Sequence, residues 1–268
     1  MYGVIIAFKD YRPTRPIEAS PWAGFYYFQS FFKDPYFFRL LRNTVSISGL
    51  SILFGFPAPI ILALLLNEIR NVKFKRVVQT VSYMPHFISL VVVCGIIKTY
   101  TQTNGLFNDI VVLFGGERSN MLMDKSMFYP IYVLSGIWQE VGWGSIIYLA
   151  AIAGIDQEQY EAARIDGAGR LRQIISITLP GLLPTITIMF ILRMGSVLSV
   201  GQEKVMLLYT QLTYDVSDVI STYVYRRGLL DADYSFSTAV GLFNSAINIF
   251  FLLITNAISR KVNDSSLF

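Results

Sequence analysis

The sequence predicts an all-α protein that crosses a membrane several times, and three observations lead to that fold class. Of the 268 residues, 53% are hydrophobic and only 15% are charged, whereas a soluble domain usually carries about 25% charged residues. The apolar residues are gathered in long blocks that each approach the ~20 residues a helix needs to cross a bilayer. Lys and Arg lie mostly between those blocks, as they do beside membranes.

Five blocks are long enough to form complete spans, with approximate bounds Thr44–Asn67, Val77–Thr101, Phe128–Gly154, Leu182–Val200 and Thr238–Ser259. Pro57, Pro59 and Pro85 lie inside two of them. Each proline removes one backbone hydrogen bond of a helix, and neighbouring helices must satisfy the group that it frees. We therefore expect kinked spans.

The connecting segments predict which side of the membrane each loop occupies. Three of them are compact and basic, namely Asn67–Gln79, Asp156–Leu179 and the tail that begins with Arg260 and Lys261. Such segments stay on the cytoplasmic side. Residues 9–43 and the segment Gln202–Phe236 are then external.

The first residues, Met1–Phe8, are too short to span and lack the basic start of a signal peptide. If the natural N-terminus is cytoplasmic, another span precedes residue 9, and Met1–Phe8 resembles the outer end of that helix. We expect six spans in the natural protein, five of them complete in this sequence. The aromatic stretches Phe25–Phe32 and Tyr36–Phe38 follow outside the membrane. They suit either anchoring in lipid headgroups or contact with a partner.

Composition argues against several kinds of site. The net charge of +4 is modest, and no dense basic cluster indicates binding of nucleic acid. The single cysteine, Cys94, has no partner for an internal disulfide. The single histidine, His86, cannot hold a metal ion alone. We expect no catalytic residue and no metal on this chain.

The most informative segment is the predicted cytoplasmic stretch Asp156–Pro184. Asp156 can cap a helix, with Gln159 three residues further on as in a capping box. Gly167 and Gly169 allow a sharp change of chain direction, because glycine adopts positive φ at little cost. Leu171–Leu179 is amphipathic, and Pro180 and Pro184 then restart the chain at the next span. Two short helices around a glycine turn would protrude from the membrane and suit docking into a cleft on another protein.

The order of residues in this segment resembles the EAA signature of type I ABC importer permeases. The matching residues are Glu161, Ala162, Ala163, Asp166, Gly167, Ala168, Ile177, Leu179 and Pro180. An ordinary amphipathic connection between two spans would share the residue types, but it would not reproduce the full spacing.

The resemblance implies a fold, partners and a mechanism. It implies the type I ABC importer transmembrane fold, in one permease domain over residues 1–268, with residues 156–180 as a cytoplasmic coupling loop. That loop would seat on a dimer of ABC ATPase subunits, where ATP and Mg²⁺ bind, and this chain would carry no cofactor. The sequence contains no G-x-x-x-x-G-K-[ST] phosphate loop of its own. Further implied partners are a second permease subunit, identical or different, an extracytoplasmic solute-binding protein and lipid of the bacterial cytoplasmic membrane.

Three further stretches resemble the polysaccharide and oligosaccharide branch of that family, namely Met1–Pro13, Ser20–Gly24 and Thr222–Gly228. Alginate importers belong to this branch. The resemblance therefore implies inward transport of a sugar polymer, with alginate or a similar acidic sugar as the specific expectation.

Ionisable residues inside predicted spans are candidate functional residues by default. Glu140 and Arg193 are of this kind, and they suit either a charge pair between helices or contact with the substrate. Trp138 and Trp143 lie near Glu140 and suit packing between helices or stacking on a sugar. Outside the membrane, Arg226 and Arg227 are candidates for contact with the binding protein.

Two other functions remain open at this stage. One is a secondary transporter driven by an ion gradient, although paired broken helices with ion sites are not evident in the sequence. The other is a membrane scaffold without transport. Only an importer requires a separate ATPase whose activity rises with a binding protein.

Overall fold

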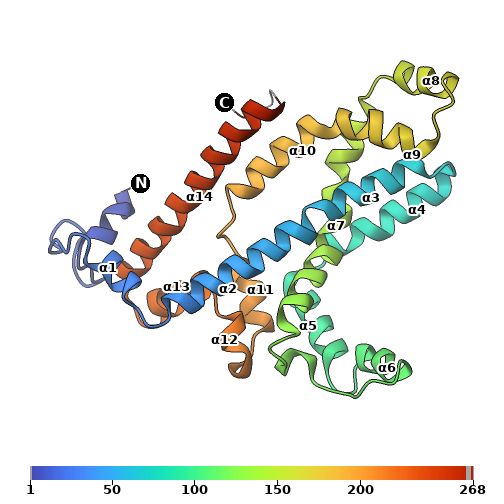
Figure 1. Ribbon diagram of the computed structural model, residues 1–268. Coiled ribbons are helices and arrows are strands. Elements are labelled where there is room, and N and C mark those ends of the chain that lie inside the picture. The colour runs from blue at the N-terminus through green and yellow to red at the C-terminus, as the bar shows by residue number, and fades with distance from the viewer. Residues whose placement is uncertain (1, 264–266, 268) are drawn as a thin grey trace. The chain divides into compact units, whose positions relative to one another are not determined.

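The computed structural model describes residues 2–263 and 267, and within them the chain is built from helices, as predicted (Figure 1). Contacts divide it into two compact units, each assembled from stretches that are far apart in the sequence. The first unit comprises Met1–Gly49, Leu90–Tyr132 and Ser196–Phe251, and the second comprises Leu50–Ser89, Val133–Gly195 and Leu252–Phe268.

The first unit contains mostly short helices. They are η1 (Tyr2–Phe8), α1 (Tyr26–Phe32), α2 (Phe37–Leu50), α5 (Leu90–Thr101), α6 (Leu106–Leu113), α11 (Gln202–Leu208), α12 (Tyr214–Ser217), α13 (Ile220–Tyr225) and most of α14 (Tyr234–Asn263). In its core, Phe31 and Leu40 pack against Ile220, Tyr223 and Phe236. The two long segments that the sequence places outside the membrane thus share one core, which agrees with their lying on the same side.

The second unit contains α3 (Pro57–Glu68), α4 (Val72–Tyr83), most of α7 (Phe128–Ala153), α8 (Gln157–Ile165), α9 (Arg170–Gln173) and α10 (Leu179–Met194). Its core joins Ile60 and Ala63 of α3 to Tyr148 and Ile152 of α7 and to Leu182 of α10.

Within the described part of the chain, three uninterrupted helices are long and apolar enough to cross a membrane: Phe37–Glu68, Arg170–Met194 and Tyr234–Lys261. Each contains one of the predicted spans or most of it. The predicted span Val77–Thr101 is instead broken, because the 3-10 turn η3 (Met84–Phe87), with Pro85 near its start, separates α4 from α5. The two parts are long and apolar enough to cross a membrane only when they are taken together.

The predicted span Leu182–Val200 is wrong at its C-terminal end. The helix begins earlier, at Arg170, and stops at Met194. Gly195 caps it, and the residues that follow form turns. Two bonds to residues far away in the sequence hold those turns: Ser48 donates to the carbonyl of Val197, and the Asn248 side chain accepts the Leu198 N–H. Hydrophobicity alone could not separate these apolar turns from helix.

The prolines are accommodated without breaking two of the spans. The π-helical turn η2 (Ser51–Gly55) precedes Pro57 and Pro59, and the π-helical turn η5 (Ile174–Thr178) precedes Pro180 and Pro184. In a π-turn the backbone hydrogen bonds join residues five apart instead of four. This shift accommodates the prolines, which have no backbone N–H to donate. The expectation that Pro180 and Pro184 restart the chain was therefore wrong, because the helix continues through both.

Much of this apolar surface is uncovered. Among the 18 consecutive residues of Phe37–Glu68 that are most apolar, only 11% are buried. Leu53, Ile61 and Leu65 are all more than half exposed. A soluble monomer seldom exposes so large an apolar surface, so lipid or partner subunits must cover it.

Candidate functional site

The loop that joins α7 to α10 begins with the short helix α8. Asp156 stands at its N-cap, where its Oδ1 accepts the backbone N–H of Glu158 at 3.0 Å. This bond satisfies one of the N–H groups that a helix start leaves free. The predicted N-cap is therefore present, and Glu158 in the first turn adds a favourable charge at the positive end of the helix.

The helix ends in a glycine turn of the Schellman type. Gly167 has φ of +74°, and its N–H bonds to the carbonyl of Arg164 at 3.0 Å. The next N–H, of Ala168, bonds to the carbonyl of Ala163 at 2.8 Å. This pair of bonds defines the Schellman motif. The predicted turn is formed by Gly167 alone, because Gly169 has φ of −67° and serves as the N-cap of α9.

Side-chain contacts hold the two arms of the loop together. The Tyr160 hydroxyl of α8 lies 2.9 Å from the hydroxyl of Thr178, which is buried in the helix that leads into α10. Gln173 donates to the carbonyl of Ala168 at 2.8 Å, which ties α9 back to the turn. The loop is thus a folded element whose shape is fixed by its own residues.

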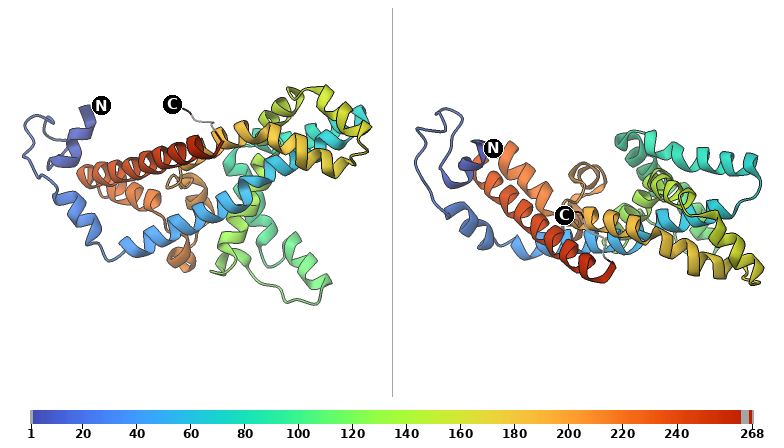
Figure 2. Two further views of the ribbon diagram at one scale, coloured as in Figure 1. Left: turned by 45° about the horizontal axis from the view of Figure 1, so that its top comes forward. Right: turned by 90° about the horizontal axis from the view of Figure 1, so that it is seen from above.

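The loop lies at the same end of the second unit as the turn between α3 and α4 (Figure 2). Arg170 at the start of α9 is 3.7 Å from Glu68 at the end of α3. The sequence predicts both segments to be cytoplasmic, and this ion pair agrees with their common placement.

The surface of the loop is unexpectedly apolar at two positions. Ile165, the last residue of α8, is 87% exposed, and Leu171 in α9 is 71% exposed. Ala162 and Glu161 of the predicted signature are exposed as well. An apolar side chain that protrudes from a hydrophilic loop is a typical anchor for a partner protein. Ile165 is not among the residues predicted from the sequence, although an isoleucine between two charged residues at a helix end is a signal for such an anchor.

A cluster of polar and aromatic side chains lies in the middle of α7. Glu140 is paired with His86, with 2.9 Å between Oε2 and Nδ1. The imidazole of His86 stacks flat on the indole of Trp143, with ring centroids 4.6 Å apart and an interplanar angle of 1°. The contacts of His86 with Glu140 and Trp143 were not predicted from the sequence. The predicted pairing of Glu140 with Arg193 stays a prediction.

The predicted span Leu182–Val200 would place Arg193 near its middle. In the structure Arg193 lies in the last turn of α10, next to the final residue Met194, because the helix ends six residues before Val200. Arg193 therefore lies at the end of its candidate span.

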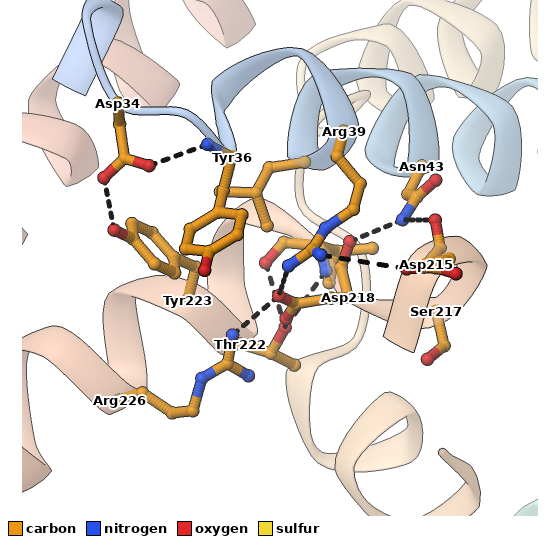
Figure 3. A network of polar contacts seen from close by, with 12 residues as sticks. Asp34, Tyr36, Arg39, Asn43, Asp215, Ser217, Asp218, Thr222, Tyr223 and Arg226 are labelled. Atoms are coloured by element: carbon orange, nitrogen blue, oxygen red, sulfur yellow. Dashed lines mark hydrogen bonds and ion pairs between the residues drawn. The ribbon is translucent and has the colours of Figure 1, made fainter. Parts of the chain in front are cut away.

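The outer segments of the first unit are joined by a network around Asp218 (Figure 3). The Asp218 side chain is fully buried, and its Oδ2 accepts bonds from Arg39 at 3.2 Å and Arg226 at 2.6 Å. Thr222 donates to the other oxygen at 2.8 Å, and Asn43 donates to the backbone carbonyl of Asp218 at 2.9 Å. Two arginines and a hydroxyl thus offset the cost of burying the carboxylate.

This network gives Arg226 a structural partner within the chain. Arg227 likewise lies 3.4 Å from Asp233. Both arginines were predicted to contact a binding protein, and that role stays a prediction. Replacing either residue would now also disturb an internal ion pair.

Two ionisable groups of the outer segments are shifted by their surroundings. Burial together with the bond to Asp10 raises the pKa of Tyr27 to about 12. The hydrogen bond from Lys125 lowers the pKa of Asp215. Both shifts come from contacts that join separate stretches of the first unit.

Residues 55–264 match the family described as "Binding-protein-dependent transport system inner membrane component". The chain is similar to Protein LplB of Bacillus subtilis (strain 168), with 48% identity over 269 residues that cover 100% of this chain and 85% of that protein. It is 44% identical to the polygalacturonan/rhamnogalacturonan transport system permease protein YteP of the same strain, over 100% of this chain and 84% of that protein.

Two solved structures share the fold. One is a bacterial ABC transporter involved in the import of the acidic polysaccharide alginate, with a TM-score of 0.91, 43% identity and coverage of 98% of this chain and 89% of that chain. The other is a bacterial alginate ABC transporter in complex with an alginate pentasaccharide-bound periplasmic protein, with a TM-score of 0.92, 42% identity and coverage of 100% and 89%.

The helical fold and these similarities define a transporter permease. The chain belongs to the family of inner membrane components of binding-protein-dependent transport systems. It is a multi-pass membrane protein with the type I ABC importer fold, and its relatives are permease subunits rather than enzymes.

Proposed function

We propose that this chain is the transmembrane subunit of an ABC importer that carries an acidic oligosaccharide inward across the bacterial cytoplasmic membrane. ATP hydrolysis takes place on a separate pair of subunits, and a solute-binding protein delivers the sugar from outside. The single observation that supports this most strongly is the folded loop from Asp156 to Thr178, with its exposed apolar anchor Ile165.

The loop is suited to transmit force between subunits. Its first helix, α8, is connected to α10 through both the backbone and the Tyr160–Thr178 contact. A movement of a partner docked on α8 would therefore be passed to the transmembrane helix α10. The loop transmits such a movement only if it stays rigid, and the Schellman turn at Gly167 supplies that rigidity.

The substrate class is supported by the relatives. One is named for polygalacturonan and rhamnogalacturonan transport, and a solved structure of the same fold belongs to an importer of alginate. Both names refer to acidic polysaccharides. We infer that this chain handles oligosaccharides that contain uronic acids, with alginate fragments as the first substrate to test.

The test is reconstitution of the permease with its ATPase, second permease and binding protein in proteoliposomes. Uptake of oligouronates should require ATP and the binding protein. Uptake that instead follows an ion gradient without ATP would support a secondary transporter. No uptake of any saccharide would refute the proposal.

A surface variant tests the docking loop within the same assay. Ile165→Glu places a charge on the exposed anchor and should reduce ATP-driven uptake at least tenfold, together with loss of the ATPase subunits on purification. The matched control is Val72→Glu, which changes an apolar residue that is 62% exposed in another predicted cytoplasmic segment. Equal loss in both variants would contradict a docking role for Ile165.

A further inference from the structure

Several aromatic side chains in the outer segments of the first unit are exposed instead of packed in its core. Phe38 is 78% exposed, Trp22 71% and Phe25 66%. Tyr26 and Phe32 are exposed as well, and these five residues together are called the outer aromatic face below. A soluble protein seldom exposes so large an apolar surface, so something outside the chain covers this face.

The short helix α1 divides its residues between two sides. At 100° per residue, its exposed side spans about 120° and carries aromatic rings and two polar side chains: Phe25 at the N-cap, Tyr26, Gln29, Phe32 and Lys33. The opposite side carries Phe31, which is buried in the core of the first unit. One side of α1 therefore holds the fold together, and the other is left to the surroundings of the protein.

α1 runs along the beginning of α14 (Figure 1). Its first turn lies at the start of that helix, because Tyr27 lies beside Ser235. Its last residue lies further along, because the ring centroid of Phe32 is 5.4 Å from that of Phe243. Ser235 and Phe243 are eight residues apart, which is ~12 Å at 1.5 Å per residue.

This course places α1 at the outer boundary of the bilayer. The predicted span in α14 begins at Thr238, so Ser235 lies outside it and Phe243 lies five residues inside it, or ~8 Å deep. Interfacial helices bury their apolar residues about 5–10 Å into the boundary between headgroups and acyl chains. Phe32 thus reaches the acyl boundary, while Phe25, at the start of α1, lies at the level of the headgroups.

The outer aromatic face continues the uncovered surface of two candidate spans. Phe38 belongs to the span that begins with Phe37, and the ring of Phe37 packs on that of Phe32 with 5.4 Å between centroids. On α14, Phe250 follows Phe243 by seven residues and shares its side of the helix. Phe250 is more than half exposed. One apolar surface therefore extends from the spans onto α1.

The composition of this face identifies lipid as its cover. Lys33 lies among the rings, is exposed, and forms no ion pair with any described residue. Lysine is depleted at interfaces between proteins, whereas at a membrane surface its ammonium group can extend to lipid phosphates. Trp and Tyr are enriched at the same level of a bilayer. A partner that docks only transiently would return these rings to water each time it left.

We propose that α1 anchors the outer segments in the outer leaflet of the membrane. Phe32 and Phe38 contact acyl chains, Trp22 and Phe25 lie among the headgroups, and Lys33 extends to a lipid phosphate. The anchor holds the outer ends of α2 and α14 at a fixed depth. The inference rests on the multi-pass membrane class of the protein and not on the transport of a sugar.

The test attaches a nitroxide spin label to a cysteine introduced by Phe25→Cys or Phe32→Cys and measures its collisions with two reagents. Oxygen concentrates in lipid, and a nickel chelate stays in water. The complete importer is measured in proteoliposomes, and the unaltered chain, whose single cysteine Cys94 is buried, gives the background signal. Arg15→Cys, at an exposed position in the same outer segment, is the matched control.

At Phe32 we expect collisions with oxygen to exceed those with the nickel chelate about threefold or more. The ratio should be smaller at Phe25, which lies nearer to water, and should be reversed at Arg15. Two labelled positions on α1 keep the test decisive if one variant fails to assemble.

Three other outcomes would overturn the inference. Dominant nickel collisions at both Phe25 and Phe32 would place the face in water. Few collisions with either reagent would place it against another permease subunit. Few collisions only after the binding protein is added would identify that protein as the cover.

Discussion

Replacing Gly167 by alanine tests whether the shape of the docking loop, rather than its surface, couples the permease to its ATPase. Gly167 has φ of +74°, and no atom lies within 4 Å of the position that a Cβ would occupy. The substitution therefore adds almost no steric conflict. Its whole effect comes from forcing an L-residue into the left-handed region.

The magnitude follows from that conformation. The left-handed region costs an L-residue about 1–2 kcal/mol relative to the right-handed one. A cost of this size lowers the ratio of the turn to other conformations of the loop by a factor of about 5 to 30. If docking needs the turn, ATP-driven uptake should fall by up to that factor. Gly167→Leu should reduce uptake further, because it also enlarges the docking surface.

Gly169 provides a control only two residues away. Its φ is −67°, and a Cβ there would also meet no atom within 4 Å. Gly169→Ala should therefore leave uptake unchanged. Both variants are measured in proteoliposomes for uptake and for ATPase stimulation by the binding protein. Equal losses in the two variants would refute the conformational argument, and wild-type uptake in Gly167→Ala would refute the coupling role of the turn.

Two further predictions concern the outer segments. Asp218→Asn leaves Arg39 and Arg226 without their buried counter-charge, a change that typically costs about 3–5 kcal/mol. The thermal unfolding temperature of the purified importer in detergent should fall, whereas Asp231→Asn at an exposed position should leave it unchanged, and equal temperatures would contradict the role of the network. Tyr27 has its pKa raised from 10.0 to about 12, so its contribution to stability is complete below pH 10 and is lost as the pH rises through 12. Tyr27→Phe should flatten the loss of thermal stability between pH 10 and pH 12, and an unchanged slope would show that other groups cause it.

The predicted spans agree with the observed helices at two places and differ at a third. Long apolar blocks predicted the spans Thr44–Asn67 and Thr238–Ser259, which lie within the observed helices Phe37–Glu68 and Tyr234–Lys261. The prediction works there because a transmembrane helix must satisfy its own backbone and present apolar side chains throughout. The same reasoning failed at the end of α10. The residues after Gly195 are apolar but are held in turns by Ser48 and Asn248, and composition contains no information about such distant partners.

The loop from Asp156 to Thr178 was predicted in more detail, because its determinants are local. Asp156 caps a helix through a neighbour two residues away, and Gly167 is needed for a turn closed by bonds to residues three and five positions earlier. Each of these contacts depends on spacing along the chain. The bond between Tyr160 and Thr178 spans 18 residues and was not foreseen.

The sequence by itself determined the membrane class, the helical fold and the shape of the loop between α7 and α10, because hydrophobicity, capping and glycine geometry act over short stretches of chain. Only the tertiary structure decided which charges meet. Glu140 is bonded to His86 across a broken span, and Arg226 is held by the buried Asp218 together with Arg39 from a helix far earlier in the chain. Such pairs form where burial makes an unpaired charge costly, and which residues are buried together depends on the packing of whole helices.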